Sequence, residues 1–316
     1  MPLITLEEHY LDPELATYFK MNATPMSEKL LDFDSIRIGD MDRSGIDMQV
    51  LSHAPPGLQR VEAAAAPALC ARVNDRLAAR VNANPNRFAA FAALPTTAGG
   101  QAAADELERC VTALGFKGGL LNGLTDGRFL DEPEYRPVFA CAEKLDVPLY
   151  IHPADPDAEV TRRYFGDYVR THPMFLRAAW GFTMETGTHA MRLVLSGLFE
   201  QHPGLKIILG HLGEAIPYLL TRIDEALSRD TPMKNFRKVF TTHFYVTTSG
   251  FFSDSALRLC LDEMGAERVL FSVDWPYAAN NHATTWFREV SLTDEERELV
   301  AHQNARDILN LTLLKR

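Results

Sequence analysis

Four residues with metal-binding side chains follow short apolar runs at widely separated places in the chain. Glu7 and His9 end the run LITLEEH, His152 ends VPLYIH, and Asp274 ends RVLFSVD. Two carboxylates and two imidazoles form a suitable set of ligands for one divalent metal ion. A Glu-x-His pair alone is more simply explained as a surface cluster near a terminus, so the metal interpretation depends on whether the fold brings the four residues together.

The first of these runs predicts which side chains share a face. Side chains alternate between the two faces of a strand, so Glu7 and His9 point one way while Leu6 and Glu8 point the other. We therefore expect Glu7 and His9 at the site and Glu8 facing away from it.

Two further histidines end strand-like runs. His53 ends DMQVLSH, and taken alone it is more simply explained as a structural histidine than as a ligand. His211 ends LKIILGH and is followed three residues later by Glu214. This spacing places the two side chains about one turn apart, within reach of a shared hydrogen bond, if a helix starts there.

The strand-like runs alternate with segments of helical periodicity. The eight predicted strands are residues 3–9, 47–53, 87–94, 115–122, 147–152, 205–211, 244–250 and 268–274. The clearest predicted helices are residues 61–85, 101–115, 135–146 and 189–204. This alternation predicts an α/β fold, a (β/α)8 TIM barrel, with a doubly wound open sheet as the main competitor. In a barrel the C-terminal ends of the strands surround one mouth, where the candidate ligands would meet.

Two long intervals are predicted as loop insertions at that mouth. Residues 10–45 are too irregular for a single helix and are predicted as loop plus helix, and residues 154–188 carry aromatic side chains able to line a pocket. Neither interval has the low complexity of a linker, and the chain has no internal repeat. Residues 1–316 are therefore assigned to one domain.

Composition and charge restrict the class of protein. The 316 residues include 32 basic and 42 acidic side chains, and the net charge of −10 argues against a nucleic-acid or anionic-membrane partner. No run of about 18 apolar residues suggests a membrane span, and the first residues do not resemble a signal peptide. The four cysteines are far apart and are expected as thiols. These features predict a cytoplasmic enzyme or binding protein.

Several longer stretches carry a family resemblance. They are LEEHY (6–10), YIHP (150–153), residues 180–224 with the motif GHLGEAIPYLLTRID, VTTSGFF (246–252), RVLFSVDWPYAANNHATTWF (268–287) and HQNARDILNL (302–311). Together they resemble the amidohydrolase superfamily and, within it, the branch of non-oxidative decarboxylases. The resemblance implies a metal-dependent decarboxylase of a hydroxylated aromatic acid such as a dihydroxybenzoate. It also implies a homodimer or homotetramer.

The resemblance assigns roles to individual positions. The metal ligands of the family correspond to Glu7, His9, His152 and Asp274. Its catalytic pair corresponds to His211 and Glu214, and Arg222 occupies a position that approaches the substrate or supports the pair. Asp274 is then the expected proton donor to the ring carbon.

The sequence departs from the wider family pattern at several positions. Many metallohydrolases of the superfamily begin with His-x-His and bridge two metals with a carboxylated lysine on strand four. Here Glu7 replaces the first histidine, and Lys117 lies several residues before the end of that strand. We therefore expect one divalent ion per chain, Zn²⁺ or Mn²⁺. Tyr277 stands where phenylalanine is expected and His53 where a non-ionisable residue is expected, so both are predicted to contact substrate.

These side chains suit protonation of an aromatic ring followed by loss of carbon dioxide. A metal can hold the substrate carboxylate and the adjacent phenolate oxygen together, which lowers the phenol pKa and fixes the orientation. Asp274 can then protonate the ring, tuned by His211 and Glu214. Trp180 could provide a flat apolar wall, although core packing explains it equally well. No organic cofactor is needed.

Other functions could use the same residues. A metal-dependent hydrolase of a lactone or amide, or a hydratase of a ring-cleavage product, would use metal-bound water. Such enzymes differ from a decarboxylase in whether water or the substrate's own oxygens fill the open metal positions. A barrel kept only for binding or scaffolding is disfavoured because His211, Glu214 and Arg222 are intact.

Overall fold

Short parallel strands form the centre of residues 1–311, the part of the chain that the computed structural model describes. They are β1 (Ile4–Tyr10), β2 (Met48–His53), β3 (Phe88–Ala90), β4 (Ala92–Ala93), β5 (Gly119–Asn122), β6 (Leu149–His152), β7 (Ile207–Leu209), β8 (Phe244–Thr247) and β9 (Val269–Leu270). One sheet has the order β1-β2-β3, and the other runs from β4 to β9 in sequence order.

The two sheets meet at two places, which completes the barrel. Between β3 and β4 the ladder is interrupted at Phe91, whose backbone nitrogen still donates to β2 at 2.9 Å. At the other junction, a parallel bridge joins Glu8 to Trp275, and the His9 nitrogen donates to the Trp275 carbonyl at 2.8 Å. The predicted barrel is confirmed, with the predicted strand 87–94 divided into two.

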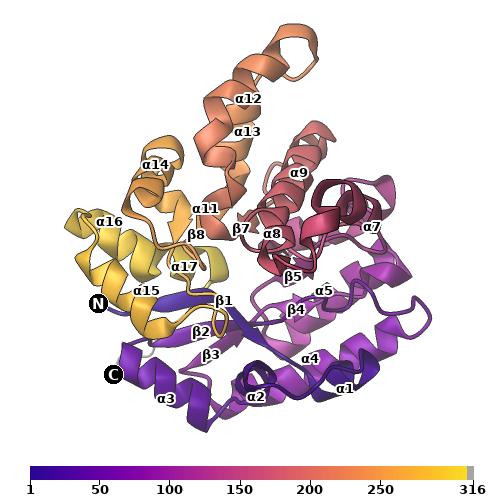
Figure 1. Ribbon diagram of the computed structural model, residues 1–316, viewed down its shortest axis with the longest axis vertical. Coiled ribbons are helices and arrows are strands. Elements are labelled where there is room, and N and C mark those ends of the chain that lie inside the picture. Colours follow the sequence, from indigo (N-terminus) through magenta and orange to yellow (C-terminus); the bar gives the residue numbers. More distant parts are fainter. Residues whose placement is uncertain (312–316) are drawn as a thin grey trace.

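Helices follow most strands and lie outside the barrel (Figure 1). The α-helices are α1 (Pro13–Tyr18), α2 (Pro25–Leu31), α3 (Ser35–Ser44), α4 (Ala66–Ala83), α5 (Gly100–Leu114), α6 (Arg136–Lys144), α7 (Ala158–Val160), α8 (Pro173–Leu176), α9 (Gly181–Leu195), α10 (Leu198–Gln201), α11 (His211–Glu214), α12 (Ile216–Asp230), α13 (Phe236–His243), α14 (Asp254–Met264), α15 (Asn280–Glu289), α16 (Asp294–Glu298) and α17 (Asn304–Leu309). Short 3₁₀ or π turns are Thr96–Ala98, Pro133–Tyr135, Thr161–Phe165, Gly166–Tyr168, Ala266–Arg268 and Leu299–Gln303.

Three of the four clearest predicted helices correspond to α4, α5 and α6, with ends shifted by a few residues. The prediction for residues 189–204 was wrong in its bounds. Helix α9 begins at Gly181, inside the predicted insertion, and ends at Leu195. Gly197 then takes a left-handed φ of 70°, which separates α9 from the short α10.

The insertions contain short helices. Residues 10–45 hold α1, α2 and α3, and residues 154–188 hold α7, α8 and the first part of α9. Helices α12 and α13 pack on each other and project beyond the rest of the molecule (Figure 1). The single-domain prediction covers residues 1–316, of which 312–316 lie outside the described residues.

Apolar side chains fill both sides of the barrel wall. A cluster that draws on successive strands includes Leu6, Val50, Phe91, Tyr150, Ile208 and Leu270. A larger cluster packs the strands against the surrounding helices. All four cysteines are free thiols, as predicted. None of the helices in residues 1–311 combines the length and apolar composition that crossing a membrane requires.

Candidate metal centre

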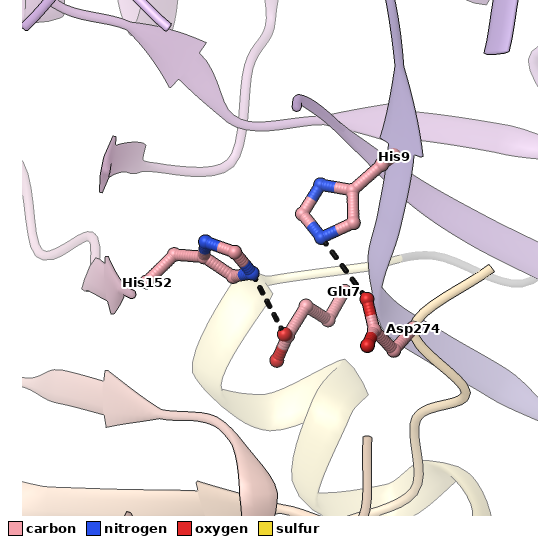
Figure 2. A group of neighbouring side chains, drawn as sticks. All are labelled: Glu7, His9, His152 and Asp274. Atoms are coloured by element: carbon pink, nitrogen blue, oxygen red, sulfur yellow. Dashed lines mark ion pairs between the residues drawn. The ribbon is translucent and has the colours of Figure 1, made fainter. Parts of the chain in front are cut away.

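Four metal-binding side chains meet at one mouth of the barrel. Ligand atoms of Glu7, His9, His152 and Asp274 all lie within 4.8 Å of one another. His152 Nε2 is 3.1 Å from Glu7 Oε1, and His9 Nε2 is 3.3 Å from Asp274 Oδ1. Figure 2 shows the four side chains pointing toward one another. The structure thus brings together the four ligands predicted from the sequence.

The strand ends explain this convergence. Glu7 and His9 share one face of β1, while His152 is the last residue of β6. Asp274 lies four residues beyond β9, where its backbone takes a left-handed φ of 75°. Because the strands are parallel, their C-terminal ends meet at the same side of the barrel.

The facing atoms are suited to a cation. Glu7 Oε1, His9 Nε2 and Asp274 Oδ1 are buried, and none has a hydrogen-bond partner within residues 1–311. Buried polar atoms are normally hydrogen-bonded, so three such atoms facing one another indicate a site built for an ion. Carboxylate oxygens and imidazole nitrogens suit Zn²⁺ or Mn²⁺.

Neighbouring hydroxyl groups orient Glu7. Its Oε2 accepts hydrogen bonds from the Tyr150 hydroxyl, from Ser249 Oγ at 2.5 Å and from Thr247 Oγ1 at 3.5 Å. Hydrogen bonds that occupy one oxygen leave the other free to face the site, as is usual around metal-binding carboxylates.

Burial and charge set the protonation of the ligands. Burial alone would raise the pKa of Glu7, but His211, His152 and His9 outweigh it and hold this pKa well below its usual value. Burial lowers the pKa of His9, which favours the neutral imidazole. A carboxylate and a neutral imidazole are the forms that bind a metal.

His211 and Glu214 form the pair expected from their spacing. His211 Nδ1 is 2.7 Å from Glu214 Oε1, and Glu214 is buried. His211 Nε2 faces the ligands, at 3.5 Å from Glu7 Oε1 and 3.8 Å from Asp274 Oδ2. Burial lowers the pKa of His211, but the carboxylates of Glu214, Glu7 and Asp274 together raise it well above its usual value.

The turn that joins this pair is not an ordinary right-handed helix. His211, Leu212, Gly213, Glu214 and Ala215 all have positive φ, so the turn is left-handed. At Gly213 a Cβ atom would lie 2.8 Å from Val246 Cγ1, so the close approach to β8 also requires glycine.

Two predicted substrate contacts lie on partly exposed surface. The Tyr277 ring is 49% exposed, with its centroid 5.6 Å from that of His9. Burial of its hydroxyl and the nearby Asp274 carboxylate raise the pKa of Tyr277 to about 12. Trp180 caps the start of α9 and is 52% exposed, so packing in the core does not account for it.

The other two predicted substrate contacts are placed differently. His53 is buried, its Nε2 accepts from the Asp12 nitrogen at 3.0 Å, and its Nδ1 donates to the Ala54 carbonyl at 2.7 Å. Burial lowers the pKa of His53 to about 4. Because backbone groups occupy both ring nitrogens, any substrate contact would use the carbon edge of the His53 ring. Arg222 is exposed on α12.

Several supporting residues were not predicted from the sequence. Tyr150 lies two residues before His152, so strand alternation could have placed it on the same face. Ser249 lies two residues after Thr247 in the stretch VTTSG, where the same rule applies. Glu8 faces away from the ligands, as predicted, yet it is fully buried. Nothing in the local sequence indicates that burial.

The sequence and the fold both match known proteins. The amidohydrolase family matches over residues 9–311. The gamma-resorcylate decarboxylase of Rhizobium sp. (strain MTP-10005) is 39% identical over 330 residues, which covers 98% of each chain.

Two solved structures share this fold. One is a 2,6-dihydroxybenzoate decarboxylase complexed with 2,6-dihydroxybenzoate, which has a TM-score of 0.90 and 39% identity over 98% of this chain and 100% of that one. The other is a dihydroxybenzoic acid decarboxylase from Polaromonas sp. JS666 with bound manganese and the inhibitor 2-nitroresorcinol. Its TM-score is 0.89, with 37% identity over 98% of this chain and 97% of that one. This chain belongs to the amidohydrolase family.

Proposed function

We propose that this protein is a metal-dependent non-oxidative decarboxylase of a hydroxylated aromatic carboxylic acid, such as a dihydroxybenzoate. The observation that carries the proposal is the group of Glu7, His9, His152 and Asp274, with His211 beside it. A manganese-containing relative and one with bound 2,6-dihydroxybenzoate, both of the same fold, support the reaction and the substrate class.

The four ligands would hold one Zn²⁺ or Mn²⁺ ion, with no organic cofactor. Such an ion supplies charge that orients the substrate carboxylate and stabilises the neighbouring phenolate. Asp274 donates a proton to the ring carbon that carries the carboxylate. The bond from that carbon to the carboxylate then breaks, its electron pair returns to the ring, and carbon dioxide leaves.

His211 and Glu214 support this proton transfer. Glu214 holds the imidazole through Nδ1, which leaves Nε2 directed toward Asp274. The His211 imidazolium is therefore placed to return a proton to Asp274 after each turnover. General-acid assistance of this kind contributes about 10²–10⁴-fold to the rate.

Four residues are proposed as substrate contacts. Tyr277 and Trp180 offer aromatic surface beside the ligands and on the neighbouring insertion. Arg222, exposed on α12, is proposed to approach the substrate or to support the pair of His211 and Glu214. The ring edge of His53 is proposed to limit the substituents that the substrate ring can carry.

Metal analysis combined with carbon dioxide release tests the function. The purified protein, with added Mn²⁺ or Zn²⁺, would be incubated with a panel that includes 2,6- and 2,3-dihydroxybenzoate. About one metal per chain with release from one acid, abolished by a chelator and restored by metal, supports the proposal. One metal per chain without release from any hydroxybenzoate contradicts it and directs the search to lactone hydrolysis.

We also propose that the protein is a single-domain homodimer or homotetramer in the cytoplasm. The exposed aromatic side chains of Tyr164, Tyr168 and Tyr218 are candidates for the interface between subunits. The four free thiols support a reducing compartment. Light scattering on the purified protein and cell fractionation test these two statements, and a monomer would contradict the first.

A further inference from the structure

Glu8 faces the back of the metal centre and binds the chain on both sides of Asp274. Its Oε1 accepts from the Val273 nitrogen at 3.0 Å, and its Oε2 accepts from the Trp275 nitrogen at 3.2 Å. Asp274 thus sits between two backbone N–H groups held by one buried carboxylate.

The backbone of Asp274 needs such support. Its φ of 75° lies in the left-handed region, which is costly for a residue other than glycine. Such a conformation persists only where the surroundings hold it in place. The hydrogen bonds from Val273 and Trp275 to Glu8 supply two of these restraints, and the His9 nitrogen supplies another through the Trp275 carbonyl.

The Glu8 carboxylate is itself fully engaged. Besides the two backbone donors, Ser272 Oγ donates to Oε1 at 3.2 Å and Gln49 Nε2 donates to Oε2 at 3.3 Å. Ser272 Oγ also accepts from the backbone nitrogens of β1, where the pairing with β2 shifts register between Thr5 and Glu8. Four donors leave the carboxylate little freedom to turn.

Arg37 connects the hydrogen bonds around Glu8 to the backbone of the candidate ligand His9. The guanidinium is fully buried. It donates through Nη1 to Gln49 Oε1 at 3.1 Å and through Nη2 to the His9 carbonyl at 2.5 Å. Its Cζ lies 4.1 Å from the centroid of the Trp275 ring. A buried cation without a direct carboxylate partner is costly, so its retention calls for a specific role.

We propose that Glu8 and Arg37 are positioning residues, which fix the Asp274 backbone relative to His9 and thereby set the geometry of the metal centre. Neither side chain belongs to the ligand group. They act from behind it, through backbone groups of both metal-bearing segments. The inference rests on the metal site of the proposed function.

Two substitutions test the inference. In Glu8→Gln the amide has one acceptor oxygen, so its NH₂ group faces a backbone N–H that needs an acceptor. Arg37→Lys keeps the charge but loses the planar guanidinium, whose two terminal nitrogens reach Gln49 and the His9 carbonyl at the same time. The matched control is Glu106→Gln, which makes the same change from acid to amide at another buried glutamate, bonded to Asn74 and Arg109 on the outer helices.

Co²⁺ titration of the intact protein gives a readout that does not depend on activity. We expect E8Q and R37K to bind Co²⁺ about 10- to 100-fold more weakly than wild type, with an altered visible absorption spectrum. With Mn²⁺, kcat should fall while KM changes little. E106Q should match wild type in Co²⁺ affinity, in the absorption spectrum and in the kinetic constants with Mn²⁺, even where its Tm falls.

The possible results separate the two proposals. If E8Q and R37K bind Co²⁺ with wild-type affinity and spectrum, and lose only stability as E106Q does, the positioning role is overturned. The same conclusion follows if neither variant folds, because the network then serves the fold as a whole. If wild type itself fails to bind about one Co²⁺ per chain, the metal centre is refuted and the inference with it.

Discussion

The hydrogen bond between Glu214 and His211 provides the sharpest single test of the catalytic arrangement. Glu214→Gln keeps the size of the side chain but replaces a charge-assisted bond of 2.7 Å with a neutral one. A hydrogen bond to a charged group contributes about 1.5–3 kcal/mol. Since about 1.36 kcal/mol corresponds to a tenfold change in rate, kcat should fall about 10- to 150-fold.

A second His–Glu pair in the same chain supplies the control. His202 Nδ1 lies 2.7 Å from Glu143 Oε2, outside the metal centre, so Glu143→Gln makes the same replacement in a bond of the same type and length. The assay is the initial rate of carbon dioxide release at saturating substrate, with metal content measured on the same samples. E214Q should retain its metal, and E143Q should retain wild-type kcat. Equal losses of kcat in both variants, or none in E214Q, would refute the assignment of Glu214.

Three further substitutions have distinct expected outcomes. Asp274→Asn should abolish measurable carbon dioxide release even in samples that still contain metal, and substantial activity would remove Asp274 as the proton donor. Ser249→Ala removes the 2.5 Å donor to Glu7 and should raise the metal dissociation constant about 10- to 100-fold; an unchanged value in a metal titration contradicts the role given to Ser249. Burial raises the pKa of Glu185 to about 8, so the folded chain holds a proton that the unfolded chain releases near its ordinary value of 4.5. Stability should therefore fall as pH rises from about 5 to 8, and Glu185→Gln should raise Tm by about 2 °C or more at pH 8 but not at pH 4, as measured by calorimetry.

Local sequence signals placed the candidate ligands at one mouth of the barrel, and the family resemblance selected them as ligands among the residues there. Glu7 and His9 were placed on one face by the alternation of a strand, and His152 and Asp274 by the ends of apolar runs. These signals need no knowledge of which strands are neighbours, because every C-terminal strand end in a parallel barrel reaches the same mouth.

Features that depend on contacts between distant segments were not predictable in this way. The burial of Glu8 follows from the junction of β1 with the segment after β9, and the partners of Arg37 come from three parts of the chain. The left-handed turn at His211 is a different case. Only Gly213 among its residues favours positive φ, so the motif GHLGEA indicates no such turn by itself.

The junction between β1 and β9 has a consequence for how metal loss would affect the whole protein. Within residues 1–311, the barrel is joined here by the bridge from Glu8 to Trp275, with no ladder of paired strands between β1 and β9. A metal ion bound by Glu7 and Asp274 would act there as a cross-link between the two ends of the chain, closing a loop of most of its length. Removing the ion would leave the Glu7 and Asp274 carboxylates across this seam with the His211 imidazolium as their shared counter-charge. Loss of the ion would therefore remove the chemistry and one restraint on the closure of the barrel together, and the stability of the fold would rise with metal supply.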